Sequence, residues 1–141
     1  MAVYNADTVF NKKGKPATVS LDWNCGRINF SCNAVRLLGL KEGMRVTFET
    51  KENEPDLIYF YEDAKGIPLK LYGVHWEGVS LSIFCRPLSR ILLSHFKLKK
   101  NTTFDVTAQT INLQDRLKPV WFIDKWKKHE PVKWRKVHGY W

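Results

Sequence analysis

Two changes of hydrophobic period occur within residues 26–48, and they constrain the fold more than any other feature of the sequence. Ile28 and Phe30 alternate with polar residues, which is the pattern of a half-buried strand. Ser31 is placed to cap a short helix, and Gly39 stands where such a helix ends. The apolar face expected of this helix consists of Ala34, Leu37 and Leu38. Because alternation resumes after the Lys-Glu-Gly turn that follows, the segment predicts one strand–helix–strand unit.

The same order of elements recurs later in the chain. The first set of matched pairs, at an offset of 53 residues, is Trp23/Trp76, Ile28/Leu81, Phe30/Ile83 and Cys32/Cys85. A second set, from Ala34/Leu92 to Phe48/Val106, has an offset of 58 because the second helix would be five residues longer. Few pairs are identical, so a chance match is the alternative. The alignment predicts two repeats, about residues 17–62 and about residues 67–123, that pack as a pseudo-symmetric pair.

Length and composition fit one folded domain. The chain has 141 residues and 16.5 kDa, with 44% hydrophobic and 13% aromatic residues, which is enough for a sizeable core. Further strands are predicted at residues 17–23, 57–61, 67–72, 79–83, 102–107 and 120–123, and Arg86-Pro87 opens the second helix. The expected fold class is mainly β with two short helices, a barrel-like domain over residues 1–123 followed by a tail over residues 124–141.

Three features bear on the compartment. No apolar run is long enough for a transmembrane helix, so we expect no membrane partner. The first residues lack the basic and apolar regions of a signal peptide. An odd number of cysteines, three, indicates free thiols in a reducing compartment. We therefore expect a cytoplasmic protein, or a virion-associated one if a phage encodes it.

The net charge of +9 and the pI near 9.6 favour anionic partners, nucleic acid first. The alternative is that the charge only keeps the chain soluble. Much of it lies in the last 24 residues, Lys118–Trp141, which hold seven Lys or Arg against two acids and four of the six tryptophans.

Cations and aromatic residues in this tail suit binding to single strands, in which bases stack on rings and lysines meet phosphates. The alternative is that the tryptophans pack against the domain or a protein partner. Pro119 and Pro131 also bracket a segment that could form a short helix through Lys128. The tail residues with candidate binding roles are Lys125, Trp126, Lys127, Lys128, Lys133, Trp134, Arg135 and Lys136.

One segment matches the residue pattern of a catalytic signature, but the spacing of its acids does not fit the site. Pro55-Asp56 followed by Asp63-Ala64-Lys65 resembles the metal-dependent nuclease pattern PD-(D/E)xK, in which both acids bind one metal. Here the two acids flank a single predicted strand, which at ~3.3 Å per residue separates them by roughly 23 Å. They cannot share a metal, so a nuclease is rejected.

Other chemistry has weaker support. Cys25, Cys32, Cys85 and His75 have no close CxxC or His pair, so no metal site is predicted, and no cofactor is expected. Cys32 and Cys85 are expected to be small buried residues, with a disulfide between them as the alternative. His95 falls on the apolar helix face with Leu88, Ile91, Leu92 and Phe96, where a hydrogen-bonded core histidine is the usual outcome. These observations give no argument for an enzyme.

The segment Gly-Arg-Ile-Asn-Phe, followed by Ala-Val-Arg-Leu-Leu-Gly-Leu-Lys-Glu-Gly-Met-Arg-Val-Thr-Phe, resembles the AbrB/SpoVT/MraZ superfamily of DNA-binding domains. The match is best over residues 39–46. The sequence departs from the family pattern at Ser31-Cys32, where proline is usual, and at Met44, where aspartate is usual. The resemblance implies a swapped-hairpin (cradle-loop) barrel that binds DNA, with two repeats in one chain as in MraZ.

The first functional hypothesis is accordingly a non-enzymatic DNA-binding protein, an AbrB-like regulator or a nucleoid-type binder, which uses a basic face of the barrel. The residues expected to contact DNA are Arg27, Arg36, Lys41, Arg45, Arg86, Arg90, Lys97, Lys99 and Lys100. The second hypothesis is a structural or assembly protein of a phage or mobile element, whose aromatic tail docks on a protein partner. An enzyme of unknown chemistry is the third, and an oligomer is compatible with all three.

Overall fold

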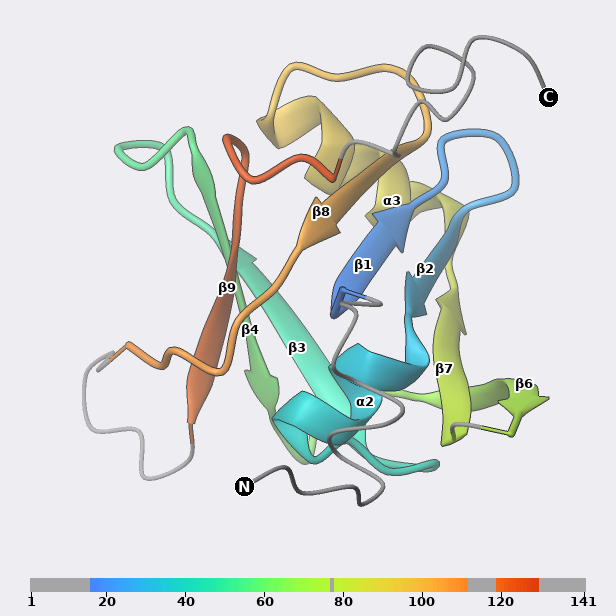
Figure 1. Ribbon diagram of the computed structural model, residues 1–141. Helices are drawn as coiled ribbons and strands as arrows, with labels where there is room; N and C mark the ends of the chain where they lie inside the picture. The colour runs from blue at the N-terminus through green and yellow to red at the C-terminus, as the bar shows by residue number, and fades with distance from the viewer. Residues whose placement is uncertain (1–15, 77, 112–118, 130–141) are drawn as a thin grey trace, which may run out of the picture.

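The computed structural model describes residues 16–76, 78–111 and 119–129 (Figure 1). In that part of the chain lie nine strands and two helices, which confirms a β-rich fold with two helices. The elements are β1 (Thr18–Leu21), β2 (Arg27–Phe30), α2 (Cys32–Leu38), β3 (Arg45–Thr50), β4 (Leu57–Glu62), β5 (Ile67–Pro68), β6 (Lys70–His75), β7 (Gly78–Phe84), α3 (Arg86–His95), β8 (Thr102–Asp105) and β9 (Val120–Asp124). Neither helix is long and apolar enough to cross a membrane.

The strands form two antiparallel sheets. One has five strands in the order β6-β7-β2-β1-β8, and the other has four in the order β5-β3-β4-β9. The centre of the five-stranded sheet is the β2–β7 ladder, in which Asn29 faces Ser82 and Arg27 faces Phe84. The early strands β1 and β2 therefore lie side by side between the late strands β7 and β8.

The two sheets are not closed into the barrel that the sequence predicts. Within the described residues no ladder joins them: β9 pairs with β4, and the chain meets β8 only after the turn that follows β9. Only a single bridge, between Phe104 and Lys128, follows that turn. The expected swapped-hairpin pseudo-symmetry is not shown either: β1 pairs with β8, whereas β3 pairs with the two-residue β5 rather than with β6.

The two helices lie at opposite ends of the five-stranded sheet. Helix α2 directly follows β2 and α3 directly follows β7, and these neighbouring strands run antiparallel. The chain therefore leaves them in opposite directions, and Figure 1 shows α3 near the top and α2 near the bottom of the molecule. This separation decides where the predicted basic residues fall.

Local signals of helix α2 behave as the sequence predicts. The Ser31 side chain accepts a hydrogen bond from the Ala34 N–H (3.2 Å), and Gly39 ends the helix in the left-handed conformation, at φ 69°. The predicted apolar faces need correction. In α2, Val35 is buried and Leu37 is 46% exposed; in α3, Ile91 is 59% exposed. Neighbouring strands cover only part of each apolar stripe.

The core lies between the two sheets. Its aromatic centre is Phe60, whose ring centroid is 5.7 Å from that of Phe30 and 5.6 Å from that of Trp121. Trp121 is 7% exposed, so this tryptophan packs against the domain. Phe96 and Phe104, at 5.3 Å, fill the end of the core beneath α3. The core thus ties helices and sheets into one unit.

The described start of the tail is attached to the domain. Lys125 N donates to Asp56 O (2.9 Å), Asp105 N donates to Lys127 O (2.8 Å), and His129 N donates to Thr103 O (2.8 Å). The short helix expected through Lys128 is therefore wrong: β9 and a turn take its place, because the backbone groups of Lys127 and His129 pair with β8 instead. Trp126 is 72% exposed. Lys133, Trp134, Arg135 and Lys136 lie outside the described residues.

Candidate nucleic-acid interface

The nine predicted DNA contacts do not form one face. Three of them lie around α2 and the turn after it: Arg36, Lys41 and Arg45. The other six gather at the opposite end, around α3, and we call this group the α3 basic face. Its members are Arg27, Arg86, Arg90, Lys97, Lys99 and Lys100. Lys97, Lys99, Lys100 and Arg86 are exposed, and the other two are half-buried.

The α3 basic face is assembled from segments far apart in sequence. The β1–β2 turn bonds to the loop after α3, where Trp23 N donates to Asn101 Oδ1 (2.7 Å). The same turn bonds to α3 itself, where Ser89 Oγ, fully buried, donates to Asp22 O (2.7 Å). Cys85 N donates to Gly26 O (3.0 Å) at the start of the helix. These bonds fix the cations relative to one another before any ligand binds.

Gly26 permits the closest approach of the two segments. A Cβ atom built on Gly26 would lie 2.2 Å from the Arg86 Cα, and the residue has a φ of +81°. Both the space and the backbone conformation require glycine here. Arg86 is therefore held directly against the β1–β2 turn, beside Arg27.

Two of the arginines are oriented by aromatic rings. The Arg90 guanidinium lies 4.9 Å from the Trp23 ring centroid, and its Nε donates to Trp23 O (2.9 Å). The Arg27 guanidinium lies 4.3 Å from the Tyr72 ring centroid, and its Nη1 donates to the Tyr72 hydroxyl. Cation–π contact and hydrogen bond together restrict each side chain to one direction.

The segments that supply the α3 basic face contain little negative charge. Residues 22–27 and 84–101, which supply all six cations, contain one acid, Asp22. Its carboxylate accepts hydrogen bonds from Cys25 N (2.9 Å) and Asn24 N (2.8 Å). The bonds from Cys25 chiefly hold the pKa of Asp22 below its usual value, and the nearby Arg27 charge contributes. At neutral pH the face keeps a local excess of positive charge.

The three cations at the α2 end are more dispersed. Arg36 Nη2 donates to Asn33 Oδ1 (2.6 Å) within the helix, and Arg45 Nη1 donates to Gly66 O (3.1 Å). Lys41 is exposed in the turn. Acids also lie beside this group, since Glu42 follows Lys41 and Asp63 bonds Thr47 (2.9 Å) on β3. This end has the weaker positive character.

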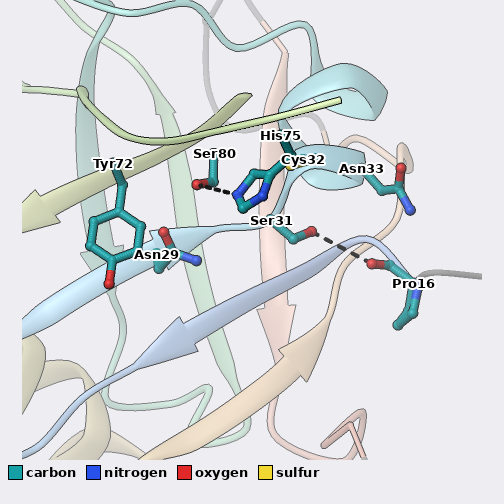
Figure 2. A pocket seen from close by; sticks show the side chains of 8 residues that line it. All are labelled: Pro16, Asn29, Ser31, Cys32, Asn33, Tyr72, His75 and Ser80. Carbon is teal, nitrogen blue, oxygen red and sulfur yellow. Dashed lines mark hydrogen bonds between the residues drawn. The ribbon is translucent and has the colours of Figure 1, made fainter. Parts of the chain in front are cut away.

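A pocket of about 330 Å³ opens on the outer face of the five-stranded sheet, between β2, the start of α2 and the β6–β7 hairpin (Figure 2). Its lining is polar and aromatic and includes Asn29, Ser31, Asn33, Tyr72, His75 and Ser80. The Ser80 hydroxyl is 3.5 Å from His75 Nε2, the outer limit of a hydrogen bond. Pro16 and Cys32 complete the wall. Among the described residues, no Lys or Arg lines this pocket.

The described residues bear on the nuclease motif, the metal site, the cysteines and the histidine that the sequence brought into question. Asp56 and Asp63 lie at opposite ends of β4, as the rejection of a nuclease requires. Within the described ranges, no three His, Cys, Asp or Glu side chains are grouped to hold a metal ion. None of the three cysteines, all of which the structure describes, forms a disulfide, and Cys32 and Cys85 are half-buried rather than fully buried. His95 Nε2 lies 3.0 Å from the carbonyl oxygens of Glu54 and Leu57, a hydrogen-bonded structural position.

The sequence patterns did not indicate the aromatic partners of the cations. Trp23, Tyr72 and Phe84 come next to arginines only through long-range strand pairing and loop contacts. Arg27 lies opposite Phe84 in the β2–β7 ladder, a register that the repeat alignment does not specify.

No protein-family model, curated protein or solved structure matches the chain.

Proposed function

We propose that this chain is a DNA-binding protein that contacts the phosphate backbone of a duplex through the α3 basic face. The observation that carries the proposal is the fixed cluster of six cations from two segments that contain a single acid. Phosphate contacts supply most of the affinity of a protein that binds DNA with little sequence preference. The resemblance of residues 26–48 to the AbrB/SpoVT/MraZ superfamily supports the same assignment. The proposed role is binding alone, without a catalytic step or a cofactor.

The geometry suits a duplex backbone. Helix α3 has ten residues and is about 15 Å long, at ~1.5 Å per residue. Arg86 lies at its start, Arg90 in its middle and Lys97 just after its end, so cations recur along its exposed side. Six phosphate contacts would give a plot of log affinity against log salt concentration a slope of about −5.

The test is a fluorescence-anisotropy titration of a 20-base-pair duplex over a series of salt concentrations. One variant combines Lys97→Gln, Lys99→Gln and Lys100→Gln. A matched control combines Arg36→Gln, Lys41→Gln and Arg45→Gln, which removes the same charge at the α2 end. We expect the first variant to lose affinity and to reduce the slope by about 3, and the control to stay close to the wild type.

Two results would overturn the assignment. Equal losses in both triple variants would mean that the net charge acts without a defined face. Unchanged binding in the Lys97/Lys99/Lys100 variant would remove the α3 basic face as the contact surface.

A second candidate, an assembly protein, has its own observation in its favour. The β6–β7 hairpin, whose strand β6 is at the edge of its sheet, exposes Val74 (74%), Trp76 (81%) and Phe84 (60%), together with Leu71 and Tyr72. At ~200 Å² per ring, the three aromatic residues alone expose roughly 400 Å², about half of what one partner contributes to a stable interface. A second copy of the chain, which would present the same area, is the occupant we favour.

Sedimentation velocity of the full chain over a concentration series tests this second role. Self-association that weakens in the Val74→Ser/Trp76→Ser variant would support it. A monomer at every concentration would exclude it.

A further inference from the structure

Two side chains in the pocket on the outer face of the five-stranded sheet have hydrogen-bond donors that no other described residue uses. Asn29 Oδ1 accepts from Ser82 Oγ (2.7 Å), which fixes the amide so that its nitrogen is the free end. In the described part of the chain, nothing accepts a hydrogen bond from this nitrogen. The Tyr72 hydroxyl accepts from Arg27 and keeps its own hydrogen for donation. The pocket therefore offers donors to a ligand that carries carbonyl oxygens or ring nitrogens.

The pocket is rigid on one side and open on the other. Its floor is β2 and β7, where Ser82 is fully buried and Ser80 is 4% exposed. Ser31, at its edge, is already satisfied, since its hydroxyl caps α2 and accepts from Thr18 N (3.0 Å). Tyr72 and His75 form the outer wall from the exposed strand β6, as Figure 2 shows. A planar group can enter beside the Tyr72 ring without disturbing the core.

The pocket adjoins the α3 basic face. Asn29 and Arg27 point to the same side of β2, and two residues along a strand span about 7 Å. Arg27 also stacks on Tyr72, so one residue belongs to both the basic face and the pocket wall. A ligand with a planar polar group in the pocket can therefore place an attached anion near Arg27.

We propose that this pocket binds one unpaired nucleobase of the nucleic acid whose backbone lies on the α3 basic face. The inference rests on the proposed function and adds the form of DNA that is preferred. A volume of about 330 Å³ is ample for a base. Unpaired bases are recognised by aromatic stacking and by hydrogen bonds to their polar edges, which Tyr72, Asn29 and His75 supply. Because none of the described residues that line the pocket is a cation, a free phosphate fits it less well.

The experiment compares four labelled DNAs by anisotropy: a perfect 20-base-pair duplex, the same duplex with a one-nucleotide bulge, the bulge with an abasic site, and a single strand. Stacking on an aromatic residue makes a base bind about 5- to 150-fold more tightly, so we expect the affinity for the bulged duplex to exceed that for the perfect duplex by about tenfold. The abasic bulge should lose this gain, because its backbone is equally flexible but it has no base.

The variant Tyr72→Ala/His75→Ala should abolish the preference, so that bulged and perfect duplexes bind equally well. Because Tyr72 also orients Arg27, the affinity for both duplexes should fall somewhat, and the ratio of the two affinities is the readout. Both side chains are on an exposed strand, so the fold should tolerate the change. Leu71→Ser/Trp76→Ser is the matched control, since both residues are exposed on the same hairpin but outside the pocket, and it should keep the preference.

The anisotropy results distinguish a failure of the pocket inference from a failure of the proposed DNA binding. Salt-dependent duplex binding with no gain from a bulge, or a gain that survives in the Tyr72/His75 variant, overturns the pocket inference alone. No binding to any of the four DNAs at low salt overturns the proposed function as well.

Discussion

The Arg90 guanidinium covers the Trp23 ring at 4.9 Å and bonds to the carbonyl of the same residue at 2.9 Å. This pair joins α3 to the β1–β2 turn, and Arg90 is also one of the residues proposed to contact DNA. Arg90 therefore stabilises the platform as well as contributing charge to it.

Arg90→Lys separates these two contributions. Lysine keeps the charge but cannot combine the planar stack with the Nε hydrogen bond, so we expect a loss of about 1–2 kcal/mol in the free energy of unfolding. Urea denaturation followed by tryptophan fluorescence measures it. Arg86→Lys is the control, because Arg86 is exposed, and it should change stability little. Equal losses in the free energy of unfolding of the two variants would show that the Trp23 contact does not stabilise the fold.

Lys97 has a φ of 59°, the left-handed conformation in which a side chain is unfavourable. Lys97→Gly should therefore raise the free energy of unfolding by about 0.5–1 kcal/mol. Under the proposed function, the same variant loses a phosphate contact and binds DNA more weakly. Stability and affinity measured on one preparation should move in opposite directions, and a destabilised variant would contradict the backbone argument.

Gly26→Ala should be severely destabilising, by about 3 kcal/mol or more, because the new Cβ meets the Arg86 backbone rather than a movable side chain. Gly39→Ala is the matched control: its φ is also positive, at +69°, but nothing lies within 4 Å. We expect it to cost about 1 kcal/mol. Thermal unfolding of the two variants distinguishes steric clash from backbone strain. Similar losses would mean that Arg86 can move away.

The Asp22 carboxylate in the β1–β2 turn makes the stability of the protein depend on pH. Because the folded protein lowers the pKa of Asp22 below its ordinary 3.8, the folded state prefers the ionised form. Its stabilising effect is complete above pH 3.8 and is lost as the pH falls through the lower folded-state pKa. Asp22→Asn should therefore be less stable than the wild type at pH 6 and approach it near pH 3. Urea midpoints of both proteins at several pH values measure this, and a constant difference would be contrary to it.

The local features of this fold could be predicted because single residues determine them. Ser31 and Gly39 delimit α2 through backbone hydrogen bonding and conformation, and the alternation in β2 and β3 places Ile28, Phe30 and Val46 in the core. Such signals act over a few residues and survive any tertiary arrangement.

The arrangement of the candidate site could not be predicted in the same way. The antiparallel β2–β7 ladder sends α2 and α3 to opposite ends, and this divides nine expected contacts into six and three. Tyr72 reaches Arg27 because β6 joins the edge of the same sheet, with a register shift between Leu71 and Gly73. Each outcome depends on which distant strands become neighbours, and local periodicity does not specify that choice.

The pairing of β1 with β8 also has a consequence for synthesis of the chain. Thr18 lies opposite Asp105, so one edge of β1 has no backbone partner until the ribosome has released more than two thirds of the protein. Closing so long a loop is entropically costly and slow. A nascent chain that stalls before β8 would present the open edge of β1 to other molecules in the cell. Translation speed through residues 84–105 should therefore affect the yield of native protein more than the speed through the first helix.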